Sequence, residues 1–171
     1  LNIAYRELKE GNRISAGIRD IESIKGSIID PNKWPEGKII INKYDALDKS
    51  SADKWISNTL NKFGTFDSVI NCSGILSKVP FLFEDGDEKE ILNTLNINFL
   101  AIWNLCRLSW EHLCKSQRGR IIVLVSMSGK RSKGDLAAYS ASKFALMGLC
   151  QTMKNKGWDE NIRITAICPS W

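Results

Sequence analysis

A tyrosine and a lysine four residues apart could work as an acid–base pair. Tyr139 and Lys143 stand in the run YSASK, inside a segment whose apolar spacing predicts a helix. Residues four apart share one face of a helix, so the Lys143 charge is expected near the Tyr139 hydroxyl, where it favours the ionised phenol. Such a phenol can exchange protons near neutral pH. Most pairs of this kind are solvated helix faces, however, so the surrounding sequence must decide.

Polar residues follow two apolar runs upstream of this pair. The run that starts at Gly119 ends at Ser126, and the run that starts at Asp67 ends in the turn Asn71–Gly74. Continuous apolar runs are typical of parallel strands buried on both faces. Open α/β sheets bind their ligands at the carboxyl ends of such strands. We therefore expect both polar segments to lie at the ligand-binding edge of a sheet.

Each of these polar residues also has a purely structural interpretation. Asn71 could cap a turn, and Ser126 could be an ordinary hydroxyl at a strand end, with Ser128 as a nearby competitor. Asn98 lies in the apolar helical run LNINFL, where its amide competes for backbone hydrogen bonds and could simply interrupt the helix. The residues alone leave both interpretations open.

In combination, these motifs resemble the short-chain dehydrogenase/reductase family. The turn Asn71–Gly74 looks like the N-A-G motif of that family, and segment 162–170 is similar to its strand and P-G turn after the catalytic helix, with Ser170 in place of Gly. Four residues match the catalytic tetrad in order and spacing, and the spacing selects Ser126 over Ser128: Asn98, Ser126, Tyr139 and Lys143. The resemblance covers essentially the whole chain.

The resemblance implies hydride transfer between a nicotinamide dinucleotide and a carbonyl or secondary alcohol of a small molecule. Tyr139 would donate the proton to the carbonyl oxygen, and Ser126 would hydrogen-bond the same oxygen. Lys143 would favour the phenolate and bind the nicotinamide ribose. Asn98 would kink its helix and hold a water that relays protons. In the family, therefore, the structural and functional interpretations of this asparagine coexist.

The end of the strand expected at 12–18 bears on the choice of cofactor. NAD enzymes place an acidic residue there for the ribose hydroxyl, whereas NADP enzymes offer a basic group to the phosphate. Arg19 follows this strand, and its planar guanidinium suits a phosphate, while Asp20 stands one place beyond. NADP(H) is therefore favoured over NAD(H). The resemblance places cofactor contacts at Arg19, Asp45, Asn71, Ser73, Gly74, Tyr139, Lys143 and Pro169.

These residues require a scaffold of alternating strands and helices. Strands are predicted at 12–18, 38–41, 67–72, 119–126 and 162–168, and helices at 51–63, 87–115 and 138–156. This alternation predicts βαβ units and an α/β fold with a doubly wound, Rossmann-like parallel sheet.

Both ends look incomplete beside the resembled family. The family opens with a strand and a Gly-rich turn for the pyrophosphate, whereas this chain begins at Leu1 in what looks like the following helix. The chain stops at Trp171, before the segment that closes over the substrate in the family. In the strand order 3-2-1-4-5-6 the missing strand is central, so two inner edges are left unpaired. We expect one Rossmann-like domain, residues 1–171, truncated at both ends.

Composition excludes several other classes. With 171 residues, 43% of them hydrophobic, the chain can build one soluble domain. A net charge of +5 is mild, so no nucleic-acid partner is expected. The local basic cluster Lys130, Arg131 and Lys133 is interpreted as solvated loop charge. This cluster would also tolerate an acidic substrate. No apolar run reaches the ~18 residues of a membrane span, so no membrane partner is expected.

Cysteine and histidine usage bears on compartment and metals. The five cysteines lie in apolar segments without metal-ligand spacing and are read as reduced core residues of a cytoplasmic protein: Cys72, Cys106, Cys114, Cys150 and Cys168. His112 is the only histidine, which argues against a Ser-His-Asp hydrolase and a histidine metal site. No metal is therefore expected.

The same residues also allow two alternative functions, and two apolar helices predict an oligomer. A nucleotide-sugar epimerase or dehydratase uses the same Tyr and Lys, and a dinucleotide-sensing regulatory protein could keep the fold without turnover. The helices at 87–115 and 138–156 carry more apolar surface than one sheet face needs, in Phe99, Trp103, Trp110, Phe144, Met147, Leu149 and Met153. In the family these helices pair across a two-fold axis, so a homodimer or homotetramer is expected, unless the apolar faces are all intradomain core.

Overall fold

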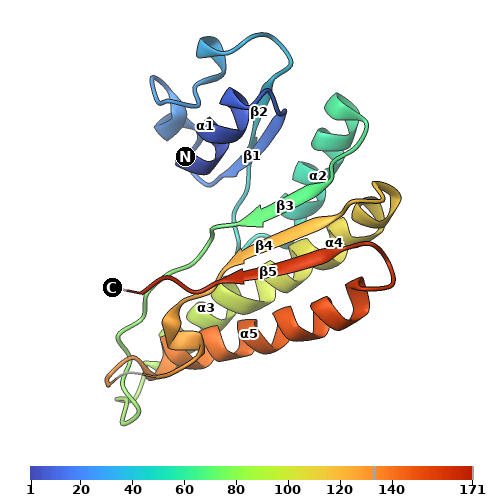
Figure 1. Ribbon diagram of the computed structural model, residues 1–171. Coiled ribbons are helices and arrows are strands. Elements are labelled where there is room, and N and C mark those ends of the chain that lie inside the picture. Colours follow the sequence, from blue (N-terminus) through green and yellow to red (C-terminus); the bar gives the residue numbers. More distant parts are fainter. Residues whose placement is uncertain (133, 171) are drawn as a thin grey trace. The chain divides into compact units, whose positions relative to one another are not determined.

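The computed structural model describes residues 1–132 and 134–170, so Lys133 of the basic cluster and Trp171 lie outside the described residues. The chain divides into two compact units, Leu1–Thr65 and Phe66–Trp171. Each unit combines parallel strands with helices, so the fold is α/β, as predicted (Figure 1). The expectation of a single domain stays a prediction, and each unit is described by itself.

The first unit is built around two parallel strands. Its elements are α1 (Asn2–Lys9), β1 (Ile14–Ile18), the 3₁₀ helices η1 (Ile21–Ile24) and η2 (Pro31–Lys33), β2 (Ile39–Lys43) and α2 (Lys49–Phe63). β1 pairs with β2 in parallel, with Ile14 opposite Ile39. Leu8, Ile24, Ile29 and Ile39 form the buried centre of this unit. The two strands are neighbours, as the second and third strands are in the doubly wound order.

A hydroxyl-centred network holds α2 on these strands. The Ser15 hydroxyl accepts hydrogen bonds from the Asn42 amide at 3.1 Å and from the Trp55 indole at 2.8 Å. Its own proton is therefore donated to the Thr59 oxygen, 2.6 Å away. The Trp55 ring lies so close to β1 that a Cβ added at Gly17 would be only 2.7 Å from it, which explains a glycine inside this strand.

The second unit carries three parallel strands in the order β3-β4-β5. Its elements are β3 (Ser68–Asn71), α3 (Glu88–Leu95), the π-helix η3 (Asn96–Leu100), α4 (Ala101–Lys115), β4 (Arg120–Leu124), the 3₁₀ helix η4 (Met127–Gly129), α5 (Ala137–Gly157) and β5 (Arg163–Ile167). This adjacency is that of strands four to six in the predicted order. Each of the predicted strands is confirmed, with bounds that differ by a few residues.

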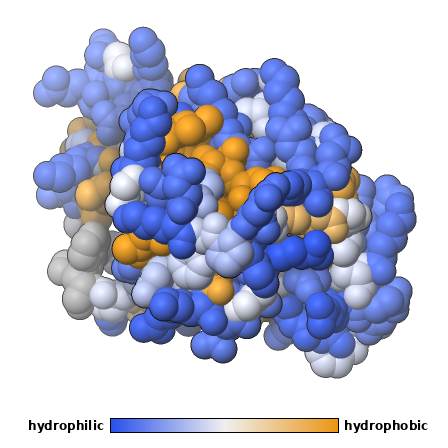
Figure 2. Space-filling model, turned by 90° about the horizontal axis from the view of Figure 1, so that it is seen from above, coloured by the Kyte–Doolittle hydropathy of each residue, from blue (hydrophilic) through white to orange (hydrophobic). Residues whose placement is uncertain are grey.

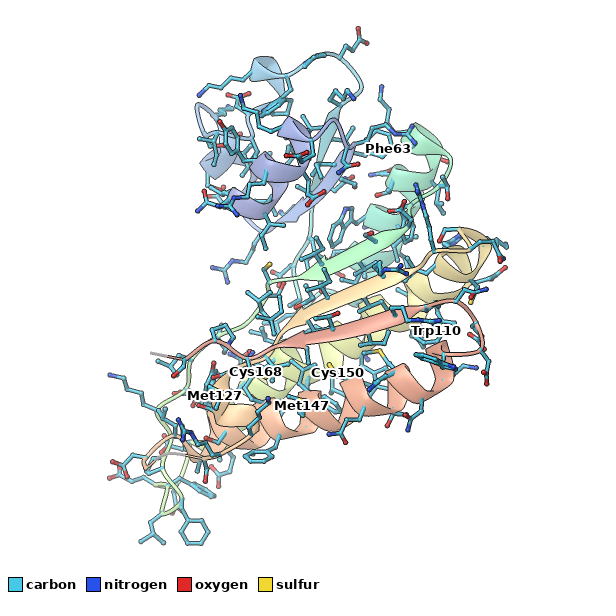
Figure 3. All side chains as sticks on the ribbon, viewed as in Figure 1. Phe63, Trp110, Met127, Met147, Cys150 and Cys168 are labelled. Atoms are coloured by element: carbon cyan, nitrogen blue, oxygen red, sulfur yellow. The ribbon has the colours of Figure 1, made fainter. Side chains whose placement is uncertain are left out.

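Helices α4 and α5 pack on this sheet, α4 against β3 and α5 against β5 (Figure 1). Their contact surfaces are apolar, and Ile102, Leu113, Ile121 and Leu146 are completely enclosed. At the far end of the two helices the Trp110 indole donates a hydrogen bond to Glu160 (Figure 3). The same ring lies over Gly157, where a Cβ would be 3.4 Å from it. These contacts join the C-terminal part of α4 to the C-terminal end of α5.

The helical region predicted at 87–115 is present but is not one regular helix. Five residues, Asn96–Leu100, form a π-helix between α3 and α4. A π-turn accommodates one extra residue per turn and is frequent at functional sites. Asn98, predicted to disturb this helix, lies in the middle of the π-turn. The irregularity therefore falls where the sequence indicated one.

The structure corrects two predictions about buried surfaces. Cys72 is exposed rather than part of the core, because β3 already ends at Asn71 and the thiol lies in the turn beyond it. Leu149 and Met153, predicted on an outer face of α5, are only 8% and 7% exposed, because that face contacts β5 and belongs to the core of the unit. Phe144, in contrast, is exposed as predicted.

One face of the molecule is mostly polar (Figure 2). Figure 2 shows charged and polar side chains over most of one face, with apolar side chains gathered in a band between them. Within residues 1–132 and 134–170, no helix is both long and apolar enough to cross a membrane.

Candidate active site

The carboxyl ends of β3, β4 and β5 bring the predicted polar turns together. The strands are in register, with Asn71 opposite Val123 and Leu124 opposite Ile167, so all three end at one edge of the sheet. Beyond this edge the Met127 amide donates a hydrogen bond to the Pro169 carbonyl at 3.0 Å. Figure 3 shows Met127 and Cys168 at this edge. Open α/β sheets bind ligands in this position.

Asn71 shapes the turn that leaves β3. Its side chain is buried, and its Oδ1 atom accepts a hydrogen bond from the Ser73 amide at 3.2 Å. This local bond is the capping role that the sequence left open for the residue. The bond orders the first residues beyond the strand, and Gly74 is exposed at the sheet edge. A cofactor contact by Asn71, Ser73 or Gly74 stays a prediction.

Asn98 joins the π-helix to the segment after β3. Its Oδ1 atom accepts the Ile75 amide at 2.8 Å, and its Nδ2 atom donates to the Ile75 carbonyl at 2.9 Å and to the Ser142 hydroxyl at 3.0 Å. The side chain is fully buried, and every hydrogen-bonding group of its amide has a partner except one lone pair of the oxygen. Asn98 therefore holds three chain segments in fixed positions.

Lys143 places a buried positive charge beside Gly74 and Asn98. The residue is only 4% exposed, and its Nζ atom lies 5.6 Å from the centre of the Tyr139 ring. Its hydrogen bond to the Leu124 carbonyl is long, at 3.4 Å. Burial lowers the pKa of the Lys143 ammonium. Tyr139 is half-buried, and in the described part of the chain its hydroxyl has no hydrogen-bond partner.

Two glycines allow the close approach of these groups. A Cβ added at Gly74 would lie 3.3 Å from the Asn98 Oδ1 atom and 3.4 Å from the Lys143 Nζ atom. A Cβ at Gly129 would lie 2.7 Å from the Lys143 carbonyl oxygen. Glycine at these positions lets the turn after β3 and the 3₁₀ helix η4 pack directly against Lys143.

Ser126 begins η4 at the end of β4. The residue is largely buried, and its oxygen accepts the Ser128 amide at 3.1 Å. Among the described residues nothing accepts the Ser126 proton, so the hydroxyl is free to donate a hydrogen bond. Asn98 and Lys143 thus lie beside Gly74, and the Tyr139 ring lies next to Lys143. Ser126 stands two residues beyond the Leu124 carbonyl that Lys143 contacts.

Arg19 and Asp45 belong to the first unit. Arg19 is exposed directly after β1, and Asp20 beside it caps η1 by accepting the Glu22 amide at 3.1 Å. The Asp45 carboxylate accepts the Leu47 amide at 2.9 Å, and the Ser51 hydroxyl binds both backbone groups of Asp45. Their predicted contacts with a dinucleotide stay predictions. Within the described residues, no group of His, Cys, Asp and Glu side chains could hold a metal ion.

Comparison with known proteins identifies the family. The family model described as short chain dehydrogenase matches residues 1–171. The chain belongs to this family. Agropine synthesis reductase from Rhizobium rhizogenes is 30% identical over 169 residues, which cover 99% of this chain and 38% of that protein. Peroxisomal multifunctional enzyme type 2 from Mus musculus is 31% identical over 134 residues, or 78% of this chain and 18% of that protein. The chain thus spans well under half of these relatives.

Solved structures share the short-chain dehydrogenase fold of this chain. A short-chain dehydrogenase from Streptomyces avermitilis superposes with a TM-score of 0.88 at 20% identity, over 99% of this chain and 61% of that one. The protein ElxO with NADP bound superposes with a TM-score of 0.87 at 22% identity, over 98% of this chain and 66% of that one. These matches confirm the predicted Rossmann-like fold class.

One residue of this short-chain dehydrogenase site was not predicted. Ser142 lies between Tyr139 and Lys143, is fully buried, and contacts both Asn98 and the Tyr139 carbonyl. A serine three residues after a helical residue can bond back to its carbonyl, so the spacing held a weak signal. The partner on the π-helix, which is distant in sequence, was not predictable.

Proposed function

We propose that this short-chain dehydrogenase transfers a hydride between NADP(H) and a carbonyl or secondary alcohol of a small molecule. The observation that carries the proposal is the buried Lys143 ammonium, 5.6 Å from the ring of Tyr139, at the carboxyl edge of a parallel sheet. A buried cation is costly unless it is paired or has a function. A reducing activity also agrees with the name of agropine synthesis reductase, a relative.

The groups around Lys143 fit a nicotinamide ribose. An ammonium has three donors, and among the described residues this one makes a single long hydrogen bond, of 3.4 Å, to the Leu124 carbonyl. Ribose hydroxyls would supply the missing acceptors. Gly74 adds no side chain to this space, where a Cβ would approach both Asn98 and Lys143. When bound, the cofactor supplies or accepts the hydride at C4 of the nicotinamide.

The side chains at the sheet edge would handle the proton and the developing charge. Tyr139 donates its hydroxyl proton to the carbonyl oxygen during reduction and takes it back during oxidation. Ser126 donates a hydrogen bond to the same oxygen, since its own oxygen already accepts the Ser128 amide. Lys143 binds the ribose and favours the phenolate form of Tyr139. Asn98 holds the water through which the site exchanges protons with solvent.

The surroundings of Arg19 support NADP(H) over NAD(H). An acidic residue near this position would bind the ribose hydroxyl of NAD and repel a phosphate. Asp20 is engaged in capping η1, whereas the described residues offer no ion pair to Arg19. The guanidinium is therefore available for the 2′-phosphate, to which it can donate two parallel hydrogen bonds.

A spectrophotometric assay tests this function. Purified full-length protein is mixed with NADPH and a panel of aldehydes and ketones, and absorbance of the reduced cofactor is followed. We expect oxidation of NADPH with at least one carbonyl. Cofactor binding without oxidation across a broad panel would contradict the proposal and favour the dinucleotide sensor, whereas release of an isomerised or dehydrated sugar nucleotide would favour the epimerase or dehydratase.

Assembly and location are further parts of this proposal. Leu92, Leu100, Trp103 and Phe144 are exposed on the helices expected to pair with a second copy. Apolar groups of this size are usually covered when they form a contiguous surface, so we propose a homodimer or homotetramer through these helices. We also propose that the enzyme works in the cytoplasm, which fractionation of cells expressing the tagged full-length protein would test.

A further inference from the structure

Ser142 makes two hydrogen bonds that link Tyr139 to Asn98. Its hydroxyl donates to the Tyr139 carbonyl oxygen at 2.7 Å and accepts from the Asn98 Nδ2 atom at 3.0 Å. The residue has no exposed surface, so water cannot replace either partner. One hydroxyl group therefore connects the residue proposed to move the proton with the residue at the centre of the π-helix.

The bond from Asn98 to Ser142 fixes which way the Asn98 amide points. In the observed orientation the Asn98 oxygen faces the Ile75 amide, and its nitrogen faces both the Ile75 carbonyl and Ser142. A flipped amide would place its oxygen against the Ile75 carbonyl and its N–H groups against the Ile75 amide. Ser142 can accept from the nitrogen because its own proton is already directed to Tyr139. The direction of the two bonds is thus determined.

The segment after β3 is held from both sides of this link. Ser77 is buried, donates to Glu90 of α3 at 2.7 Å and accepts the Val79 amide at 3.3 Å. The Val79 carbonyl in turn accepts the Ala138 amide at 3.4 Å, directly before Tyr139. The segment from Ile75 to Val79 is therefore bonded to Asn98 at one end and to the start of α5 at the other. The Asn98–Ser142 bond then connects the π-helix to α5, so the three segments are joined to one another.

We propose that Ser142 is a positioning residue that sets the place of Tyr139 relative to Lys143 and Gly74 by holding the Asn98 amide in this single orientation. The proposal rests on the proposed oxidoreductase function and deepens it. Ser142 itself touches neither substrate nor cofactor. It acts through Asn98, whose Oδ1 atom comes as close to Gly74 as the Lys143 Nζ atom does.

Removal of the hydroxyl would disturb the site in a specific way. Ser142→Ala leaves one N–H of the Asn98 amide without a partner in a fully buried place. An unpaired buried donor is costly, so the amide rotates or the π-helix shifts, and Ile75 moves with it. Because Gly74 precedes Ile75 and contacts Lys143, the ribose site and the Tyr139 hydroxyl lose their alignment. Binding of the remainder of the cofactor is unaffected.

Ser140→Ala is the matched control for this substitution. Ser140 lies on the same helix, two residues away, and is almost fully buried, but its hydroxyl has no hydrogen-bond partner among the described residues. Both variants remove the same atom from the same helix. The two substitutions therefore differ only in the hydrogen bonds lost.

The first experiment measures kcat and KM of the full-length enzyme with NADPH and its best carbonyl, with active sites counted by NADPH fluorescence titration. We expect kcat per NADPH site to fall about tenfold in Ser142→Ala, with KM for NADPH within about twofold of the unaltered enzyme. Ser140→Ala should retain kcat. Equal kcat per NADPH site in the two variants would overturn the proposal. So would a fall in the activity of Ser142→Ala that is explained entirely by a smaller number of NADPH-binding sites.

A second experiment does not depend on turnover. Midpoints of chemical unfolding are measured for Ser142→Ala, Asn98→Ala and the double variant, without cofactor. If the two residues act as a unit, Ser142→Ala clearly lowers the unfolding midpoint when it is introduced into the unaltered protein. The same substitution hardly lowers the midpoint when it is introduced into the Asn98→Ala variant. Additive shifts would contradict the Asn98–Ser142 link. If coupling is found but no carbonyl is reduced, the proposed function has failed while the link stands, so the two failures are distinguishable.

Discussion

The Lys143 ammonium and the Tyr139 ring lie on one face of α5, with 5.6 Å between the nitrogen and the ring centre. The backbone around the pair is held by the Ser142 and Asn98 hydrogen bonds, while the Tyr139 hydroxyl is unbonded in the described residues. A rigid backbone with a free phenol is suited to proton transfer, because the proton can move without rearrangement of the helix.

Replacement of Tyr139 by Phe should remove turnover and keep the fold. The substitution deletes one half-buried oxygen and no hydrogen bond within the described chain. We expect kcat to fall by about 10²–10⁴-fold, the usual contribution of a general acid, with little change in thermal stability. Steady-state kinetics and thermal unfolding of the full-length enzyme measure both. Reductase activity equal to that of the unaltered enzyme would contradict the role of Tyr139.

Lys143→Met should change how stability depends on pH. Burial lowers the pKa of Lys143 below its ordinary value of 10.5, so the charged form costs folding energy below the folded-state pKa. That cost disappears as the pH rises through 10.5, because the lysine is then neutral in both states. We expect the cofactor-free Met variant to be the more stable at pH 7, with a gap that narrows towards pH 10.5. Urea unfolding at several pH values measures the gap, and a constant gap would be evidence against this origin.

Gly129→Ala should damage both stability and turnover. The new methyl group would lie 2.7 Å from the Lys143 carbonyl oxygen and 2.8 Å from Val125, so η4 and α5 must move apart. Overpacking of this kind costs about 1–3 kcal/mol. Gly148→Ala on α5 is the control: it meets nothing within 4 Å and should stabilise the helix by about 0.5–1 kcal/mol. Thermal unfolding and kcat would show the contrast, and equal effects of the two substitutions would disprove the close approach at Gly129.

Arg19→Ala should discriminate between the two cofactors. If the guanidinium binds the 2′-phosphate, its loss raises KM for NADPH by about 10–100-fold, because a charge-assisted hydrogen bond contributes about 1.5–3 kcal/mol. NADH lacks that phosphate, so its KM should change by less than about twofold. Initial rates with each cofactor measure the ratio. Equal changes for the two cofactors would assign Arg19 a general rather than a phosphate-specific role.

Trp103→Glu should weaken self-association. Trp103 is 48% exposed and packs on Phe99, on the helical surface proposed to meet a second copy. A buried, unpaired charge at such a contact is unfavourable. Light scattering at micromolar concentration should show an oligomer for the full-length protein and a smaller species for the variant. Trp158→Glu, at another exposed Trp, should leave the mass unchanged. A monomeric unaltered protein would end the oligomer proposal.

Much of the second unit was predictable because its signals are local and strong. The strands that became β3, β4 and β5 are short apolar runs bounded by turn residues, and such runs indicate buried parallel strands. Asn71, the last residue of β3, and Ser126, just beyond β4, lie at one sheet edge as expected. Cys72 was wrongly placed in the core, because periodicity does not show at which residue an apolar strand stops pairing.

The hydrogen bonds of the site were not predictable because they join distant parts of the chain. Asn98 and Ser142 are separated by 44 residues, and each has a common local explanation in sequence. Leu149 and Met153 were wrongly assigned to an outer surface, since an apolar stripe on a helix does not reveal which neighbour covers it. In the structure both are buried, whereas Phe144 on the same helix is exposed.

The π-turn at Asn96–Leu100 also sets the rotational phase of α4. Each residue of an α-helix advances by about 100°, so the extra residue of a π-turn rotates all that follows it by about that angle. Asn98 is buried within the turn, while Leu100 at its end and Trp103 beyond it are exposed. Deletion of a single residue between 96 and 100 would remove this rotation. The Asn98 amide and the exposed apolar residues Leu100 and Trp103 would then both be displaced. The position of the Asn98 amide and the exposed apolar face of α4 therefore both depend on this one turn of helix.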